Sequence, residues 1–462
     1  MAKTRTVFFC TECGNESPRW QGQCPACSAW NTLVEEPKPE RVRSRARTGH
    51  PNGGLPRART IAAAPVRLAD VAGGDTARWR TGLGELDFVL GGGIVPGSLV
   101  LVGGEPGVGK STLLLQVAAR LQAAGQSTLY VSGEESAAQV RLRADRLEDG
   151  AGDVVFLGET ELEPMLEHAV AAHPTVLFVD SIQTAYTTEL EGAPGNVGQV
   201  RECAARLQRY AKETGTTVFL VGHVTKGGVV AGPKTLEHIV DTVLYFEGGI
   251  SLDHRVLRAT KNRFGGVDEI GVFRMTARGL EPVANPSELF LGERGVEVSG
   301  SAVAATMEGT RPLLVEVQAL CTHTTYGAPT RVATGFDRQR LALLLAVLEK
   351  RAGIVFGQLD VFLNVVGGVR IVETAGDLAV VAALASSVAD RPLPADAVFV
   401  GEVGLGGELR SVSQVERRLA EADRMGFRTA YLSARAVPAR SPGEIALVPV
   451  GDLAGLTGAL FR

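Results

Sequence analysis

Long apolar runs are missing from this sequence of 462 residues, although 45% of its residues are hydrophobic. Gly, Asp or Arg interrupts the longest apolar stretches, so none reaches the roughly 18 consecutive apolar residues that a membrane-spanning helix needs. Residues 1–10 contain no apolar segment followed by a small-residue cleavage site, which is the pattern of a secretory signal. We therefore expect a cytoplasmic protein that makes no contact with a membrane.

The chain also lacks an excess of one charge. Its 47 Lys and Arg residues and 51 Asp and Glu residues leave a net charge of −4, which by itself indicates neither a nucleic-acid-binding protein nor a membrane-surface protein. Aromatic residues make up only 5%, yet with 21% charged residues the composition is ordinary for a globular protein and argues against disorder throughout. At roughly 100 to 200 residues per domain, the length allows about two to four domains.

Cysteine is too scarce for a disulfide framework, but its spacing is informative. Four of the six cysteines form two CxxC pairs that are separated by ten residues: Cys10, Cys13, Cys24 and Cys27. Two such pairs offer four thiolates in a tetrahedral arrangement to one Zn²⁺ ion. Residues 1–35 are therefore predicted to form a zinc-binding module in which metal binding supplies most of the folding free energy. A rubredoxin-like iron site and a redox-active pair are the alternatives.

A basic segment without periodic apolar residues follows this module. Between Lys38 and Arg67 the chain has eight Lys or Arg residues and a single acid, Glu40. Pro, Gly and Ala are frequent there, so residues 36–67 are predicted to form a flexible linker. Two interpretations stay open: a solvated tether, or a basic arm that attracts phosphates.

A phosphate-binding motif follows a short apolar strand that we predict over Ser98–Gly103. The next residues read GEPGVGKS and match the pattern GxxxxGK[ST], and a helix is predicted over Thr112–Ala124. In this context Lys110 is expected to reach the β- and γ-phosphates of ATP, and the Ser111 hydroxyl is expected to ligate magnesium. The predicted ATP-binding residues of this loop are Gly104, Glu105, Pro106, Gly107, Val108, Gly109, Lys110, Ser111 and Thr112.

Two further apolar strands deliver carboxylates to the same region. The strand Val176–Ser181 contains Asp180, which is the natural second anchor for magnesium. The strand Ser127–Ser132 leads to Glu134 and Glu135, and a carboxylate at the carboxyl end of a parallel strand can orient the attacking water. We favour Glu134 over Glu135 for this role. The alternative is that either Glu only begins a helix near Ser136, where an acid favours the helix dipole.

A fourth strand, predicted over Thr216–Val221, leads to His223. A histidine at this edge can hydrogen-bond the γ-phosphate and report its loss to the segment that follows. That segment is rich in glycine and carries Lys226 and Lys234, and a second irregular loop is predicted over Tyr186–Gln199. Two such loops on one face of a nucleotide-binding core either line a pore that binds DNA or are merely irregular connections.

Three motifs together resemble a known family. The paired CxxC motifs, the segment SGEES (Ser132–Ser136) and the segment KNRFG (Lys261–Gly265) are similar to those of the bacterial recombination and repair family RadA, also called Sms, whose core resembles that of RecA-like hexameric DNA motors. The resemblance covers nearly the whole chain. It implies an α/β fold with a RecA-like P-loop ATPase core, predicted over residues 68–285, between an N-terminal zinc-ribbon-like module and a C-terminal domain.

The same resemblance implies roles for two groups of basic residues. In that family KNRFG is similar to the paired cations that a subunit extends into the ATP site of its neighbour, so Lys261 and Arg263 become candidate catalytic fingers that act in trans. Such cations neutralise the charge on the transferring phosphoryl group and make hydrolysis depend on assembly. A surface turn between strands is the alternative. The resemblance also favours DNA binding by Lys226 and Lys234.

The C-terminal region, residues 286–462, is similar to the α+β proteolytic domain of Lon. The segment around Ala375–Ala379 resembles the one that carries the nucleophilic serine there, but this chain has Leu378 at that position. Glu416 stands where the catalytic lysine would be. Leucine cannot attack a peptide carbonyl, and a carboxylate cannot supply the neutral amine that activates a serine. We therefore predict that this domain is not a peptidase and serves as a scaffold of a ring.

These motifs lead to one functional prediction and one alternative. We predict an ATP hydrolase that is stimulated by single-stranded DNA, assembles as a homo-oligomer, most simply a hexamer, and promotes branch migration of recombination intermediates in DNA repair. Its cofactors would be ATP, magnesium and zinc. The resemblance also implies contact with a strand-exchange recombinase. The alternative is a RecA-like ATPase that works as a protein-binding scaffold or timer without moving along DNA.

Overall fold

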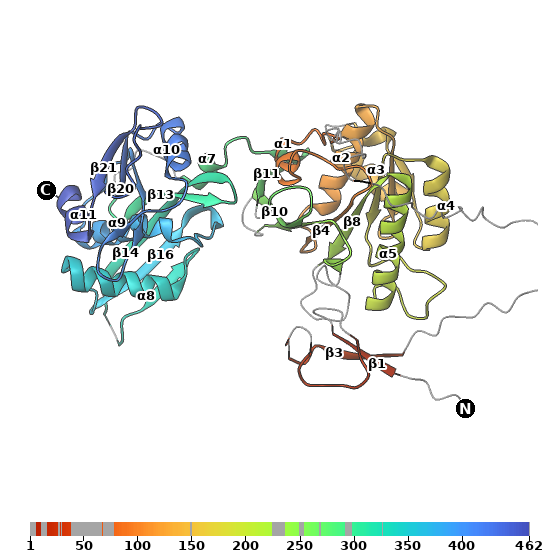
Figure 1. Ribbon diagram of the computed structural model, residues 1–462, viewed down its shortest axis with the longest axis horizontal. Coiled ribbons are helices and arrows are strands. Elements are labelled where there is room, and N and C mark those ends of the chain that lie inside the picture. The colour runs from red at the N-terminus through yellow and green to blue at the C-terminus, as the bar shows by residue number, and fades with distance from the viewer. Residues whose placement is uncertain are drawn as a thin grey trace, which may run out of the picture. The chain divides into compact units, whose positions relative to one another are not determined.

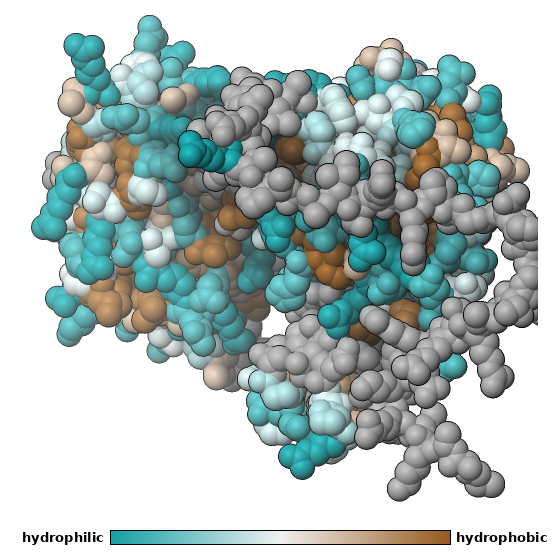
Figure 2. Space-filling model, turned by 45° about the vertical axis from the view of Figure 1, so that its right-hand side comes forward, coloured by the Kyte–Doolittle hydropathy of each residue, from teal (hydrophilic) through white to brown (hydrophobic). Residues whose placement is uncertain are grey.

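The computed structural model describes residues 6–10, 16–25, 28, 30–37, 67, 78–147, 150–223, 236–248, 254–267, 269–291, 298–325 and 327–461. The chain divides into two compact units, Met1–Pro282 and Val283–Arg462. Each unit is described by itself below (Figure 1). Hydrophilic side chains cover much of the face seen in Figure 2, and smaller apolar patches lie between them. Within these residues, no helix has the length and apolar character needed to cross a bilayer.

The N-terminal module is a small antiparallel sheet. Its strands β1 (Thr6–Cys10), β2 (Glu16–Ser17) and β3 (Leu33–Pro37) lie in the order β2-β1-β3. Cys10 and Cys24 are buried together with Leu33 in a cluster against which Phe8 packs. Cys13 and Cys27 lie outside the described residues. A core this small agrees with a module whose stability depends on a bound metal.

The centre of the first unit is a nine-stranded sheet within the described residues, in the order β12-β11-β10-β9-β4-β8-β7-β5-β6. The six neighbouring strands from β9 to β6 in this order run parallel. The three strands at the other end, β10, β11 and β12, extend the sheet with antiparallel pairing. The parallel strands are β4 (Leu99–Gly104), β5 (Thr128–Ser132), β6 (Val155–Leu157), β7 (Val176–Asp180), β8 (Thr217–His223) and β9 (Thr242–Glu247). The antiparallel strands are β10 (His254–Asn262), β11 (Ile270–Thr276) and β12 (Gly279–Pro282). The predicted α/β core with a parallel sheet is confirmed.

Helices cover both faces of this sheet, which explains why its central strands are apolar along their whole length. The helices are α1 (Gly84–Val89), α2 (Lys110–Ala123), α3 (Ala137–Ala144), α4 (Leu162–Ala172) and α5 (Val197–Thr214). Leu113 and Val117 of α2 pack in one core cluster with Phe178, whereas Leu207 of α5 packs in a second cluster with Leu177. Phe178 and Leu177 are adjacent residues of β7, so the two clusters lie on opposite faces of the strand.

The second unit contains a mixed sheet of seven strands among the residues described, in the order β15-β16-β14-β13-β17-β20-β21. Its strands are β13 (Ser301–Glu308), β14 (Arg311–His323), β15 (Arg331–Thr334), β16 (Leu359–Val365), β17 (Ala397–Val400), β20 (Thr429–Ser433) and β21 (Ala446–Val450). The short strands β18 (Glu402–Val403) and β19 (Leu409–Arg410) form a separate pair. The helices are α7 (Pro286–Phe290), α8 (Arg338–Val347), α9 (Asp377–Ala389), α10 (Val415–Arg424) and α11 (Leu453–Leu460).

The two positions compared with the Lon dyad lie in different surroundings. Leu378 is fully buried in the first turn of α9, and its N–H donates to the carbonyl oxygen of Gly401 over 3.1 Å. Glu416 lies exposed in the first turn of α10. Leu378 therefore serves as a core residue and Glu416 as a surface residue. Similarity of this unit to Lon stays a prediction.

A buried arginine holds α10 to the sheet of this unit. The guanidinium of Arg418 is fully buried and donates to the carbonyl oxygens of Ser413 and Ala305, over 3.0 Å and 2.8 Å. It also pairs with both carboxylate oxygens of Glu373, one of them at 2.7 Å. A buried charge is tolerated when it is paired and its donors are satisfied, so this pair belongs to the structural core.

Candidate nucleotide-binding and hydrolysis site

The phosphate-binding loop joins the carboxyl end of β4 to the first turn of α2. Gly104 and Gly109 have φ angles of +155° and +113°, and a Cβ atom on Gly104 would lie 2.4 Å from the carbonyl oxygen of Phe246. Glycine is therefore required at Gly104 for space as well as for conformation. No side chain caps the N-terminus of α2 at Gly109, so the amide groups of its first turn remain directed toward the loop. This arrangement suits the phosphates of a nucleotide.

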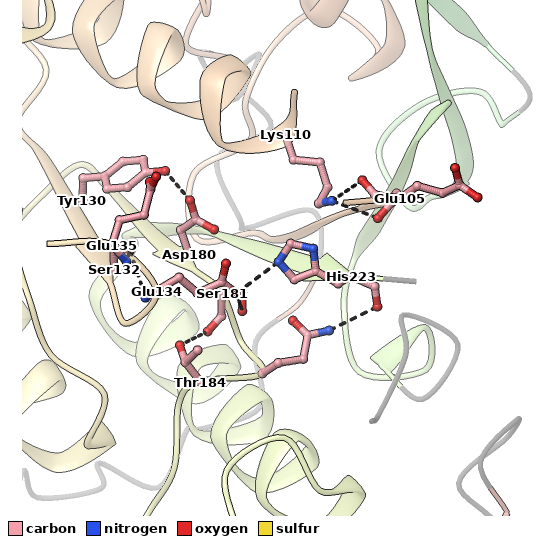
Figure 3. A network of polar contacts seen from close by, with 12 residues as sticks. Glu105, Lys110, Tyr130, Ser132, Glu134, Glu135, Asp180, Ser181, Thr184 and His223 are labelled. Atoms are coloured by element: carbon pink, nitrogen blue, oxygen red, sulfur yellow. Dashed lines mark hydrogen bonds and ion pairs between the residues drawn. The ribbon is translucent and has the colours of Figure 1, made fainter. Parts of the chain in front are cut away.

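The Lys110 side chain lies inside this loop. It is 3% exposed, and its Nζ donates to the carbonyl oxygens of Gly104 and Glu105, each over 2.9 Å (Figure 3). Burial lowers the pKa of Lys110, and the nearby carboxylates of Asp180 and Glu134 partly oppose that shift. The amine is thus held where negatively charged oxygens would restore its preference for the protonated form.

Asp180 ends β7 and is 2% exposed. Its Oδ2 accepts a hydrogen bond from the hydroxyl of Tyr130 over 2.7 Å, whereas its Oδ1 is buried without a hydrogen-bond donor among the described residues. A buried carboxylate oxygen without a donor is costly unless a cation binds it. Asp180 and the Ser111 hydroxyl, in the first turn of α2, are therefore a donor set that fits magnesium.

Glu134 follows β5 and turns toward the sheet edge where β7 and β8 end. Its Oε1 accepts hydrogen bonds from the Ser181 hydroxyl and from Nε2 of His223, the latter at 3.1 Å (Figure 3). These contacts, with the His223 hydrogen bond as the largest cause, lower the pKa of Glu134. Glu134 is therefore ionised at neutral pH and available as a proton acceptor.

The adjacent Glu135 is directed elsewhere. It forms an ion pair with Arg143 in α3, the helix that begins at Ala137 behind an N-cap at Ser136. Of the two glutamates that the sequence offered, Glu134 contacts residues from the ends of β7 and β8, and Glu135 contacts the helix that follows. The catalytic role assigned to Glu134 stays a prediction.

His223 is the last residue of β8. Its Nε2 reaches Glu134, while its Nδ1 is buried and has no partner in the described part of the chain. The side-chain amide of Gln183 donates to the His223 carbonyl oxygen over 3.4 Å. Lys226 and Lys234, the predicted DNA-binding residues, lie outside the described residues.

Lys261 and Arg263 lie at the opposite edge of the sheet from the phosphate-binding loop. Lys261 pairs with Val243 of β9, and Val243 pairs with Leu101, near the beginning of β4. The Lys261 Nζ donates to the carbonyl oxygens of Glu237 and Val240, at 2.5 Å and 2.8 Å. Burial, followed by the charge of Arg263, lowers the pKa of Lys261.

Arg263 has its own anchor at this edge. Its guanidinium pairs with Asp241 over 2.9 Å, and its side chain is 50% exposed. Asp241 also accepts a hydrogen bond from the N–H of Leu99 at the start of β4, over 3.1 Å. The structure thus brings Glu134, His223, Asp180 and Lys110 together, and it places Lys261 and Arg263 elsewhere.

Two residues of the site were not expected from the sequence. Tyr130 and Ser181 contact the carboxylates of Asp180 and Glu134, respectively. Tyr130 could be placed on a buried strand from its apolar neighbours. Its proximity to Asp180, however, depends on the pairing of β5 with β7, which are separated by more than forty residues of the chain.

Comparisons with known proteins agree with this geometry. Residues 69–229 match the family described as an AAA domain, and residues 8–35 match the rubredoxin metal binding domain. The chain is 50% identical to the DNA repair protein RadA of Pseudomonas aeruginosa over 462 residues, which is 100% of both chains. It is 50% identical to the DNA repair protein RadA of Bacillus subtilis, covering 94% of this chain and 93% of that protein. The DNA repair protein RadA of Escherichia coli is 47% identical, with 98% of each chain covered.

Proposed function

This chain belongs to the family of the DNA repair protein RadA, and we propose that it is a DNA-stimulated ATPase that works as a ring-shaped motor on single-stranded DNA. In this proposal it acts in the cytoplasm and promotes branch migration of recombination intermediates. One observation carries the ATPase part: the P-loop lysine, a buried aspartate and an ionised glutamate converge at the carboxyl edge of one parallel sheet. That edge is where open α/β sheets bind their ligands.

Each residue of the site has a task in hydrolysis. The amides at the start of α2 and the Lys110 amine hold the phosphates, and the amine leaves its two carbonyl acceptors to do so. Glu134 orients the attacking water and accepts its proton. Ser181 and His223 hold the Glu134 carboxylate at the end of β5. A magnesium ion held by Ser111 and Asp180 would neutralise charge on the phosphate oxygens.

The position of the KNRFG segment supports assembly into a ring. Lys261 and Arg263 are anchored at the amino edge of β4, while the phosphates bind at its carboxyl edge. Cations that cannot reach the ATP of their own chain remain available to a neighbouring chain. Head-to-tail contacts of this kind close into rings when the rotation between subunits permits it. We propose a homo-oligomer, with six subunits, in which Lys261 and Arg263 complete the neighbouring site.

The DNA contact is proposed for the segment that follows His223. That segment carries Lys226 and Lys234, and it begins at a residue whose ring contacts Glu134. A change at the γ-phosphate that moves Glu134 would therefore also move the His223 ring, next to the start of this segment. Lysines bind the phosphate backbone of single-stranded DNA without reading its sequence.

The outer parts of the chain complete the proposal. Residues 1–35 are proposed to bind zinc through Cys10, Cys13, Cys24 and Cys27 and to contact a strand-exchange recombinase. The second unit is proposed to support the ring without peptidase activity, since Leu378 and Glu416 stand where the resemblance to Lon would place the reacting residues.

Steady-state ATP hydrolysis with and without single-stranded DNA tests this function. The full chain is expected to hydrolyse ATP faster when DNA is present. Lys110→Ala should abolish both rates, and Lys212→Ala, which removes an exposed lysine of α5, is the matched control that should preserve them. Hydrolysis that requires Lys110 but is indifferent to DNA would contradict the motor and favour a scaffold or timer.

A further inference from the structure

Tyr130 is a buried phenol that contacts a carboxylate of the nucleotide site. It lies on β5, is fully buried, and its hydroxyl donates to Asp180 Oδ2 over 2.7 Å. Strand pairing explains the contact, because Tyr130 pairs with Phe178 and Asp180 lies two residues further along β7, on the same face. The phenol therefore approaches the carboxylate from within the core (Figure 3).

The ring of Tyr130 has little freedom to leave this position. It stacks on Phe178 with ring centroids 6.0 Å apart, and Phe178 stacks in turn on Phe219 at 5.4 Å. These three rings come from three adjacent strands of the sheet. A side chain fixed by such packing presents its hydroxyl at one defined point, so it can hold the atom that accepts its hydrogen bond.

The two carboxylate oxygens of Asp180 differ in their contacts. The Tyr130 hydroxyl donates to Oδ2. The other oxygen of Asp180, Oδ1, is buried and has no donor among the residues described. One oxygen of the carboxylate is thus engaged and the other is left for a ligand.

We propose that Tyr130 is a positioning residue that locks the Asp180 carboxylate so that Oδ1 faces the metal ion bound with the nucleotide. The inference rests on the proposed ATP site, and it adds a residue outside the phosphate-binding loop on which metal affinity depends. Outer partners of this kind orient a ligating carboxylate, and their loss typically lowers metal affinity 10- to 100-fold.

Binding of a fluorescent ADP analogue to the full chain, with magnesium and with EDTA, separates metal binding from phosphate binding. In the wild-type protein magnesium should tighten binding. Tyr130→Phe keeps the ring and its stacking but removes the hydroxyl, so it should weaken the magnesium-dependent tightening about 10-fold or more. Its affinity in EDTA should stay at the wild-type value.

Two variants serve as references. Tyr210→Phe removes another buried phenol, which donates to the carbonyl oxygen of Ala169 over 3.2 Å on the side of the sheet that α5 covers, and it should leave the metal effect unchanged. Asp180→Asn should abolish the metal effect. The ratio of the two affinities is taken within each sample, so a misfolded fraction cancels and a destabilised variant remains interpretable.

The possible outcomes distinguish a failure of the role proposed for Tyr130 from a failure of the proposed ATP site. If Tyr130→Phe keeps the wild-type ratio while Asp180→Asn loses it, Asp180 binds the metal and the role of Tyr130 is refuted. If the wild-type protein binds no nucleotide, or if Lys110→Ala binds as tightly as wild type, the proposed ATP site itself is wrong. Equal loss of the ratio in Tyr130→Phe and Tyr210→Phe would also overturn the proposal, because a general loss of packing would then explain it.

Discussion

Mixing two inactive variants tests whether Lys261 and Arg263 act on the ATP site of a neighbouring chain. One variant carries Lys110→Ala, which removes the cation of the phosphate-binding loop but keeps the KNRFG segment. The other carries Arg263→Ala, which keeps the loop but removes the finger. A finger that acts in trans makes these two defects complementary, because a Lys110→Ala subunit can still serve its neighbour.

The structure sets the geometry of this prediction. Lys261 is level with Leu101, three residues before Gly104, so the finger begins roughly 10 Å behind the phosphate-binding loop at about 3.3 Å per strand residue. Its side chain also points toward the carbonyls of Glu237 and Val240, not toward the loop. A finger in its own chain therefore cannot contact the phosphates bound by that chain.

The magnitude follows from what such cations contribute. An arginine finger raises kcat by about 10³- to 10⁵-fold, so Arg263→Ala alone should lose at least about 1,000-fold in the rate of assembled protein. Lys110→Ala alone should be inactive because it cannot hold the phosphates. In rings assembled at random from equal amounts, about one interface in four joins an intact loop to an intact finger. The mixed sample should therefore recover about a quarter of the wild-type rate.

The assay is steady-state hydrolysis with single-stranded DNA, on mixed rings isolated through a different affinity tag on each variant. Mixing either variant with the double variant Lys110→Ala/Arg263→Ala creates no complete interface and is the matched control. Mixed rings that stay as inactive as their components would refute action in trans. Full activity of Arg263→Ala by itself would refute the finger.

Three further predictions concern single residues. Glu134→Gln should slow hydrolysis about 10²- to 10⁴-fold while nucleotide binding persists. Glu135→Gln loses only the ion pair with Arg143 of α3 and should change the rate little. Equal effects of the two substitutions in single-turnover assays would contradict the catalytic role of Glu134. The hydrogen bond from His223 holds the pKa of Glu134 below its ordinary 4.5, so this carboxylate stabilises the fold above its unfolded-state pKa and loses that contribution as the pH falls. His223→Ala should therefore move the acidic limb of the pH profile of kcat to higher pH. An unshifted limb would refute the idea that the His223 hydrogen bond lowers the pKa of Glu134. Arg418→Met should destabilise the protein by about 3 to 5 kcal/mol in denaturant titrations because it removes the cation that pairs with Glu373 and the donor to two carbonyl oxygens. The Glu373 carboxylate keeps its hydrogen bonds from the Thr306 hydroxyl and the Met307 N–H, so adding Glu373→Met should restore only part of the loss; no recovery in the double variant would show that packing, not charge, sets the cost.

Short motifs were sufficient to identify the parts of the site whose chemistry is local. The phosphate-binding loop could be read from GEPGVGKS because glycines, the lysine and the helix start all lie within a few consecutive residues. The strand that ends at Asp180 and the strand that leads to Glu134 were predicted correctly because a strand buried on both faces is apolar along its length. A helix beginning near Ser136 was considered only as the alternative role of the two glutamates, because an acid favours the start of a helix; the structure has α3 begin at Ala137, with Ser136 and Gln139 forming its cap.

Which of these residues contact one another depends on the tertiary fold. The choice between Glu134 and Glu135 as neighbours of the sheet edge depends on the turn after β5, and the Tyr130 and Ser181 contacts depend on the order of strands β5, β7 and β8. The distance between the KNRFG segment and the loop likewise comes from the pairing of β10 with β9 and β9 with β4. Local patterns specify elements and their exposed chemistry, whereas strand order is set by packing between segments far apart in the chain, which no short motif encodes.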